Sequence, residues 1–423
     1  MKAKNYIKVS ILKSKLKLED YNFKCMSRRN PQDFSRNRKM GFKNMMLFML
    51  NMIKRTLQTE LNNFFEGILG EDATMSKQAF SEARNKIKPE AFIELNNEVV
   101  SGLYDEAEDL ELWNGYRLSA IDGSVLEIPN TKTLKKEFGV IRNQNGEVAR
   151  ARCACIFDIL NKIIIHSKID KYRASERNLA KDLIKQMNKS NKYNDLIIFD
   201  RGYPSAEMIS FLYENNIDFL MRVRSDFSNQ LVNARKKDQV IDIKYNDKSY
   251  PVRVIRVMIS DEVEEVLMSS LMDEKIKPDD FKELYFKRWG IETKYNELKN
   301  RLQIENFTGA TKTAIEQDFY ASIYLSNMAE FARKHSDSII KEKHADRNLK
   351  YTYRTNLNTL IGTLKDKLVM TLLEENDKKR NKMFMKIMNI ISKSAVPIRL
   401  ERKNPRKQFL IRSKYQLHKK RCL

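Results

Sequence analysis

Long apolar runs are missing from this sequence of 423 residues. A membrane-spanning helix needs about 20 consecutive apolar residues, whereas the best candidate, MMLFMLNMI at 45–53, is short and lies between basic residues. We therefore expect a buried helix there and no membrane as a partner. The basic N-terminal segment has no apolar core of the kind found in signal peptides, so secretion is not expected either.

Cysteine, histidine and glycine are also scarce, with 4, 4 and 12 copies. Few, scattered cysteines indicate a reducing cytoplasm rather than a disulfide framework. Cys153 and Cys155 form a close pair, and their spacing fits alternation on a packed strand rather than zinc ligation. The histidines are far apart in the sequence with no ligand spacing. The sequence has no glycine-rich phosphate loop, which argues against an ATPase.

Positive charge, by contrast, is in large excess. The chain has 79 lysines and arginines against 56 acidic residues, which gives a formal net charge of +23. Because contact with phosphates releases counterions, such a surface predicts a polyanionic partner. Apolar residues make up 42% of the chain, which at this length is enough for the cores of two or three domains.

Residues 1–112 have the pattern of a helical region. Two of its helices, joined by the turn GEDAT with the second opened by Ser76, could form a helix-turn-helix unit whose second helix enters a major groove. The side chains offered to DNA would then be Gln78, Ser81, Arg84 and Lys86. An ordinary helical hairpin with a solvated basic face fits the same residues, and the sequence leaves both interpretations open.

From 113 to 310 short strands and helices alternate in the order βββαβα, which predicts an α/β core, a mixed sheet covered by helices. Strand-like segments at about 226–276 interrupt this order and indicate an inserted antiparallel β group. Residues 311–423 are helical again and end in a basic tail, which from Pro397 has ten lysines and arginines and one acid, Glu401. We expect this tail to touch phosphate.

Two aspartates stand beside glycines at the ends of predicted strands. Asp122 follows YRLSAI, and Asp200 ends DLIIFD. Ligands of open α/β sheets collect at the carboxyl ends of strands, so the two side chains would face one another if the strands are neighbours. Taken singly, an aspartate at a strand end is more often a cap or turn former.

The segment LYFKRWGIETKYNELKNR at 284–301 predicts one helix with a buried stripe. Four polar residues line the border of that stripe, namely Tyr285, Arg288, Glu292 and Lys299. Glu292 would therefore look toward a cleft, where it could join Asp122 and Asp200. A surface ion pair between Arg288 and Glu292 is the plainer alternative.

Three clustered carboxylates repel one another by about 4 kcal/mol per pair at roughly 4 Å and an effective dielectric near 20, so the cluster needs cations or raised pKa values. Oxygen ligands favour Mg²⁺ or Mn²⁺, and two such ions can activate a nucleophile and stabilise a leaving oxygen at phosphorus. Arg288 and Lys299 would hold nearby phosphates. Tyr285 would hydrogen-bond a phosphate or stack on a base.

The order and spacing of these residues resemble a known family. Tyr285, Arg288, Glu292 and Lys299, separated by two, three and six residues, match the signature of the DDE transposases of bacterial insertion sequences, in the insertion-sequence family 4 group. The blocks DGS, DRGYP and RWGIE are similar to that family as well. The resemblance implies a ribonuclease-H-like core with a β insertion before the glutamate.

By the same resemblance, Asp122, Asp200 and Glu292 would form the catalytic, metal-binding triad. Tyr285, Arg288 and Lys299 would contact DNA near the transposon end, and Arg201, beside the second aspartate, is a further candidate contact. Two Mg²⁺ ions are the implied cofactors, with Mn²⁺ as a substitute.

The implied function is that of a transposase that binds the terminal inverted repeats of its element, cleaves there and transfers a 3′-hydroxyl to target DNA. Double-stranded DNA is then the partner, a homodimer forms when two ends are paired, and no small-molecule substrate is needed. The expected location is the bacterial cytoplasm, at the nucleoid. A ribonuclease-H-like nuclease without strand transfer and a catalytically inactive DNA-binding relative are the alternatives.

One feature departs from the family. Some relatives clamp a flipped base with a tryptophan in the β insertion, but this insertion has none, and its aromatic candidates are Phe227, Tyr245 and Tyr250. Trp289 lies off both stripes of the predicted helix, so we expect it to pack against a neighbouring element.

Overall fold

The chain forms two compact units in a computed structural model that describes residues 6–36, 38–51, 55–106, 110–144, 146–187, 193–260 and 263–399. The helical unit comprises residues 1–106, 299–304 and 324–423, and the sheet unit comprises residues 107–298 and 305–323. The division into three regions expected from the sequence, 1–112, 113–310 and 311–423, stays a prediction. Most of the basic tail, 400–423, lies outside the described residues, and so does its expected contact with phosphate.

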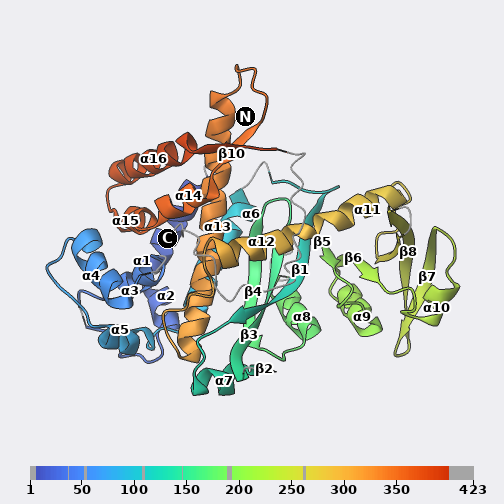
Figure 1. Ribbon diagram of the computed structural model, residues 1–423, viewed down its shortest axis with the longest axis horizontal. Helices are drawn as coiled ribbons and strands as arrows, with labels where there is room; N and C mark the ends of the chain where they lie inside the picture. Colours follow the sequence, from blue (N-terminus) through green and yellow to red (C-terminus); the bar gives the residue numbers. More distant parts are fainter. Residues whose placement is uncertain are drawn as a thin grey trace. The chain divides into compact units, whose positions relative to one another are not determined.

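A mixed nine-stranded sheet is the frame of the sheet unit within its described residues (Figure 1). Its strands are β1 (Tyr116–Glu127), β2 (Val140–Asn143), β3 (Gly146–Asp158), β4 (Ile163–Lys171), β5 (Asn194–Phe199), β6 (Asp218–Val223), β7 (Asp238–Tyr245), β8 (Lys248–Ser260) and β9 (Val263–Ser269). The order is β2-β3-β1-β5-β6-β9-β8-β7, with β4 also paired to β3. β1, β5 and β6 are parallel, and the other pairs are antiparallel.

This arrangement confirms the expected ribonuclease-H-like α/β core. The hairpin of β3 and β4 follows β1 and precedes β5, as the sequence pattern indicates, and β7, β8 and β9 form the expected antiparallel group. That group extends the main sheet, because β9 pairs with β6. Cys153 and Cys155 are buried on β3, as expected for packing residues.

The central strand β5 explains why the sheet needs helices on its faces. Its residues 196–199 form a continuous run of fully buried apolar side chains, a pattern typical of parallel strands that are covered on both sides. Burial of each such side chain stabilises the fold by about 1.5–3 kcal/mol. α8 (Glu176–Met187) packs on β1, β3 and β4, while α9 (Ala206–Glu214) packs on β6, β7 and β8.

The other helices of the sheet unit are α7 (Lys132–Phe138), α10 (Asn229–Asn233), α11 (Pro278–Lys287), α12 (Trp289–Asn300) and the part of α13 (Lys312–Lys343) up to Ile323. The last residues of α12 belong to the helical unit. The prediction of a single helix over 284–301 is wrong, because α11 ends and α12 begins at Arg288. The Arg288 amide donates to the Tyr285 carbonyl at 3.1 Å, and the Ile291 amide donates to the Arg288 carbonyl at 3.0 Å. These bonds to the third preceding residue tighten the turn, so a helical wheel cannot be continued through it.

The helical unit is built from short amphipathic helices. They are α1 (Tyr6–Glu19), α2 (Tyr21–Ser27), α3 (Phe42–Met49), α4 (Leu57–Asn63), the π-helix η1 (Phe64–Leu69), α5 (Lys77–Arg84), α6 (Glu90–Glu106), the part of α13 (Lys312–Lys343) from Tyr324 onward, α14 (Leu357–Leu364), α15 (Lys367–Leu373) and α16 (Asp377–Lys393). A small sheet pairs β10 (Tyr353–Thr355) with β11 (Ala395–Pro397). α3 includes residues 45–49 of the apolar run 45–53 and is buried there, as predicted, while residues 52 and 53 of the run lie outside the described residues. Within the described residues, no helix is long and apolar enough to cross a membrane.

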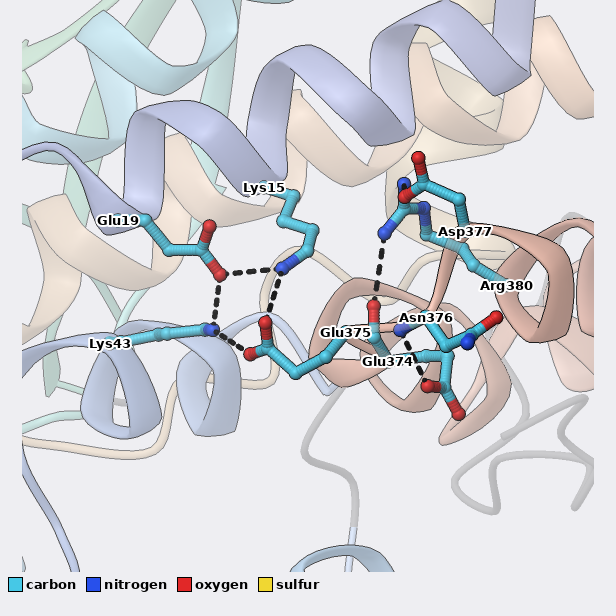
Figure 2. Close-up of polar contacts among 8 residues, drawn as sticks. All are labelled: Lys15, Glu19, Lys43, Glu374, Glu375, Asn376, Asp377 and Arg380. Carbon is cyan, nitrogen blue, oxygen red and sulfur yellow. Dashed lines mark hydrogen bonds and ion pairs between the residues drawn. The ribbon is translucent and has the colours of Figure 1, made fainter.

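A polar network ties three parts of this unit together (Figure 2). Lys15 of α1 donates to Glu19 at 2.7 Å and to Glu375, between α15 and α16, at 3.3 Å. Lys43 of α3 lies 2.6 Å from the same Glu19 oxygen and 3.6 Å from Glu375. Burial alone would raise the pKa of Glu19, but hydrogen bonds and charges from the two lysines lower it. Glu19 is therefore the centre of the network.

Replacing Glu19 with glutamine should lower the free energy of unfolding at pH 7 by about 1 kcal/mol, after allowance for solvent screening. A carboxylate with a lowered folded-state pKa stabilises the fold above its ordinary pKa of 4.5, and the contribution is lost as the pH falls through the lowered value. Denaturant unfolding at pH 7 and in strongly acidic buffer measures this. Glu82→Gln on α5, where the side chain is exposed, is the control. An equal loss at both pH values would contradict the assignment.

Candidate active site

The strands β1 and β5 bring Asp122 and Asp200 to the same level of the sheet. They are parallel neighbours, and their register pairs Tyr116 with Asn194 through Ala120 with Ile198. Asp122 and Asp200 lie two residues further along that register. Their strands are therefore neighbours, which is the condition that the prediction set. The expected strand end at Asp122 is wrong, because β1 continues to Glu127 and Asp122 pairs there with Cys155 of β3.

A buried ion pair supports this register. Arg117 of β1 and its register partner Asp195 of β5 form a bidentate contact, with N–O distances of 2.6 and 2.8 Å. Both side chains are buried, so a slip of one residue would separate two buried charges at high cost. The pair therefore holds β1 and β5 in the alignment that puts Asp122 level with Asp200.

Arg288, at the junction of α11 and α12, is the common neighbour of the three predicted acidic ligands. Its side chain is buried at 4% exposure and donates to Glu292 Oε1 at 2.9 Å. The charges of Asp200 and Glu292 raise its pKa against the effect of burial, and its own charge acts on Asp122. The ion pair of Arg288 and Glu292, the plainer alternative, is present, but its guanidinium group is buried rather than on the surface.

Burial opposes the ionisation of Asp122. Burial raises its pKa to about 6, and the charges of Asp200 and Glu176 add to the rise. The Gly123 amide, which donates to Asp122 Oδ1 at 2.8 Å, and the charge of Arg288 oppose it. Asp122 thus exchanges its proton close to neutral pH.

Asp200 behaves in the opposite way. Burial alone would raise its pKa, but the backbone amide of Arg201, the charge of Arg288 and the Tyr285 hydroxyl lower it. The Tyr285 hydroxyl donates to Asp200 Oδ1 at 3.0 Å. The pKa values of two aspartates at the same level of the sheet are therefore shifted in opposite directions, upward by burial at Asp122 and downward by hydrogen bonds and positive charge at Asp200.

Three residues near this centre escaped prediction. Tyr295 of α12 donates its hydroxyl to the Asp122 carbonyl oxygen at 2.8 Å, although the helical pattern marks it only as part of the buried stripe. Tyr203 belongs to the DRGYP block, in which only Asp200 and Arg201 are predicted to have roles. Glu176 begins α8, and nothing in its local sequence distinguishes it from an ordinary first-turn acid.

Residues 113–328 match the protein family described as the transposase DDE domain. The chain belongs to this family. It is 21% identical over 295 residues to the transposase InsG for insertion sequence element IS4 of Escherichia coli (strain K12), a match that covers 66% of this chain and 66% of the relative. The match to that relative thus spans just under two thirds of its length. A solved structure of the piggyBac transposase in a synaptic complex with hairpin DNA has a TM-score of 0.44 and 13% identity, covering 90% of this chain and 85% of that one.

The acidic centre of this DDE family member has the donor atoms of a metal site. Carboxylate oxygens suit Mg²⁺ and Mn²⁺, so the chemistry of Asp122, Asp200 and Glu292 fits. In the part of the chain that the structure describes, however, no three His, Cys, Asp or Glu side chains are grouped closely enough to hold a metal. The positive charge of Arg288 lies among the three carboxylates instead.

The predicted DNA contacts of the sheet unit fall into two groups. Tyr285 and Arg288 are buried and face the acidic residues, whereas Arg201 is exposed in the loop after β5. Lys299 is half-buried in the last turn of α12 and belongs to the helical unit. Trp289 is 49% exposed, so the expectation that it packs against another element is wrong.

Among the aromatic candidates of the β insertion, Tyr250 is buried and shares a 2.8 Å hydrogen bond with Ser210. It is therefore not offered to a base. Phe227 and Tyr245 are half-buried, and their role stays a prediction.

In the helical unit, α5 begins as predicted, with the Ser76 hydroxyl accepting from the Ala79 amide at 3.2 Å. The predicted DNA contact of Arg84 is wrong, because its side chain is 2% exposed and its guanidinium lies 5.4 Å from the Phe80 ring centroid. Positions four apart share one helix face, and here that face is buried. The other three candidates, Gln78, Ser81 and Lys86, are exposed.

Lys86 lines a cavity of about 440 Å³ in the helical unit. Three further cations line the same cavity, namely Arg36, Arg38 and Lys39, and one acid, Asp33. A concave surface with this excess of positive charge attracts phosphate. The helix-turn-helix interpretation of this region stays a prediction.

Proposed function

We propose that this DDE transposase binds the terminal inverted repeats of its insertion sequence, cleaves DNA at the element ends and transfers the freed 3′-hydroxyl to target DNA. The observation that carries the proposal is the placement of Asp122 and Asp200 at one level of β1 and β5, with Glu292 joined to them through Arg288. Family membership supports the same chemistry.

In this proposal Asp122, Asp200 and Glu292 hold two Mg²⁺ ions, for which Mn²⁺ can substitute. Bound there, the ions would activate water or a 3′-hydroxyl and stabilise the leaving oxygen at phosphorus. The chain itself supplies these carboxylate ligands and sets their ionisation. Arg288 and Tyr285 keep Asp200 ionised. Asp122, whose pKa is raised to about 6, must lose its proton before it can bind a cation.

The proposed partner is double-stranded DNA, both the transposon ends and the target. Arg201, Lys299 and Lys86 are its proposed contacts, and Tyr285 and Arg288 are proposed to reach it when the carboxylates hold cations and no longer need the guanidinium. Pairing of two ends requires two copies of the chain, hence a homodimer on DNA. The proposed location is the bacterial cytoplasm, at the nucleoid.

A cleavage assay on the repeats that flank the gene tests the proposal. Purified protein, labelled end DNA and Mg²⁺ should give cuts at the element boundary, and a pre-cut end should be joined to a target plasmid. Cuts without joining would make the protein a nuclease of the same fold. Specific binding without cuts in Mg²⁺ or Mn²⁺ would make it an inactive DNA-binding relative.

Tyr285→Phe should slow cleavage of bound ends about tenfold. The change removes the hydroxyl that donates to Asp200 but keeps the ring, and a hydrogen bond to a charged group contributes about 1.5–3 kcal/mol. Single-turnover cleavage measures the effect. Tyr213→Phe on α9, which removes a hydroxyl that donates to the Pro251 carbonyl, is the matched control. An unchanged rate in Tyr285→Phe would show that this hydrogen bond does not position Asp200 for the reaction.

A further inference from the structure

A second acidic side chain lies against the residue that follows Asp122. A Cβ atom built on Gly123 would lie 3.1 Å from Cδ and 3.2 Å from Oε1 of Glu176, closer than ordinary van der Waals contact. The φ angle of Gly123 is not positive, so its backbone conformation does not require glycine. Space explains it: the glycine of the DGS block leaves room for the Glu176 carboxylate beside Asp122.

The Glu176 side chain is held in this place by its own partner. It projects from the first turn of α8, which packs on β1, β3 and β4, and it forms an ion pair with Arg152 of β3. Arg152 is itself oriented, because its Nε donates to the Tyr172 carbonyl at 2.9 Å. The charge of Glu176 is also among those that act on Asp122. Glu176 is therefore an acid held beside the same centre, although 39% of its side chain is exposed.

A buried hydroxyl supplies an independent observation. Tyr203 is 1% exposed, and among the described residues its hydroxyl oxygen has no hydrogen-bond partner. The charges of Asp122, Glu176, Arg152 and Asp200 all act on it. A buried hydroxyl without a partner costs about 1–3 kcal/mol, so its position beside these charges indicates that a ligand of the centre completes it.

The charges of the centre also leave room for a divalent ion. Four carboxylates face two guanidinium groups, with Arg288 near Asp200, Asp122 and Glu292 and Arg152 paired to Glu176. When all four acids are ionised, two negative charges are left over.

We propose that Glu176 is a fourth carboxylate of the active site, which holds a hard divalent cation together with Asp122, while the Tyr203 hydroxyl hydrogen-bonds a water of that cation. The inference rests on the proposed function, since it assumes that the acidic centre is a cation site. It adds a ligand that the three-acid signature of the family does not contain, and it gives roles to the glycine of DGS and the tyrosine of DRGYP.

Binding of Mn²⁺ to the full chain without DNA tests the proposal by calorimetric titration. Glu176→Gln should weaken Mn²⁺ binding at least about tenfold, the size of loss seen when groups around metal sites are removed. Glu207→Gln on α9 is the control, because Glu207 also forms an ion pair with a basic residue, Lys181. This variant should bind Mn²⁺ as the wild type does. Gly123→Ala should weaken binding as well, because the added methyl displaces the Glu176 carboxylate. Thermal unfolding of each variant confirms that it folds.

A double variant separates a ligand from a counter-ion. If Glu176 served only to neutralise Arg152, then Arg152→Gln combined with Glu176→Gln would restore wild-type Mn²⁺ binding, and that result would overturn the inference. Continued weak binding in the double variant supports it. Asp122→Asn is the reference variant. If it loses Mn²⁺ binding while Glu176→Gln binds Mn²⁺ as the wild type does, this inference alone is overturned. If both variants bind Mn²⁺ as the wild type does, the cation site of the proposed function is overturned as well.

Discussion

Glu292→Gln and Asp200→Asn are each expected to reduce cleavage of the element ends by at least about a thousandfold, which corresponds to about 4 kcal/mol of activation free energy. Each change removes one negative charge from a proposed ligand of Mg²⁺ and leaves a neutral amide oxygen, a much weaker ligand for a hard cation. Cleavage of labelled ends under single-turnover conditions measures the effect.

Binding to the ends should survive both substitutions. In Glu292→Gln the new amide is a poorer partner for Arg288, but its oxygen still accepts at the position that now receives the guanidinium hydrogen bond. In Asp200→Asn the amide oxygen still accepts from the Tyr285 hydroxyl. Mobility shift of end DNA checks this. Glu283→Gln is the matched control, since Glu283 is an exposed acid of α11, and it should cut normally. Cleavage by Glu292→Gln within tenfold of the wild type would contradict the assignment of the third ligand.

The pairing of Asp122 with Asp200 could be predicted because it depends on local patterns. An apolar run such as residues 196–199 forms a buried strand almost regardless of context, and the helix α8 between β4 and β5 allows β5 to run parallel to β1. The register follows from Arg117 and Asp195, which must meet once both are buried. The sequence therefore contains most of the information that places these two acids together.

The junction at Arg288 could not be predicted from periodicity. Residues 284–301 satisfy a continuous helical wheel, yet Tyr285 must reach Asp200 while Tyr295 reaches the Asp122 carbonyl. A tightened turn between the two tyrosines meets both demands, and it depends on contacts with β1 and β5 that lie far away in sequence. Tertiary contacts here override a local preference.

Arg84 and Glu176 show the same limit for single side chains. Arg84 lies on a basic helix, but its position four residues after Phe80 puts it on the buried face. Glu176 is an ordinary acid of a first helical turn by its local sequence. Its proposed role depends on the space left by Gly123 and on its ion pair with Arg152 of β3. A motif identifies which residues to examine, whereas the partners that give them a role are found only in the folded chain.

Asp122→Asn is expected to stabilise the protein in the absence of divalent cations, by up to about 3 kcal/mol at pH 7.5. In the folded wild type the pKa of Asp122 is raised from 3.8 to about 6, so at that pH the fold must keep an unfavourable buried charge. A raised folded-state pKa means that this group stabilises the fold most below 3.8 and that the contribution is lost as the pH rises through 6. The asparagine avoids this loss, and its advantage over the wild type should shrink as the pH is lowered from 7.5 to 4.

Denaturant unfolding in EDTA across this pH range measures the effect, and Asp200→Asn provides a control of opposite sign. Because its neighbours lower the pKa of Asp200, that carboxylate stabilises the fold at pH 7.5, and its loss should be destabilising. Added Mg²⁺ should then stabilise the wild type more than Asp122→Asn, since a cation at the centre offsets the charge that Asp122 buries. A less stable Asp122→Asn in EDTA at pH 7.5 would mean that Asp122 is already compensated by Arg288, and the strain would not be available to favour cation binding.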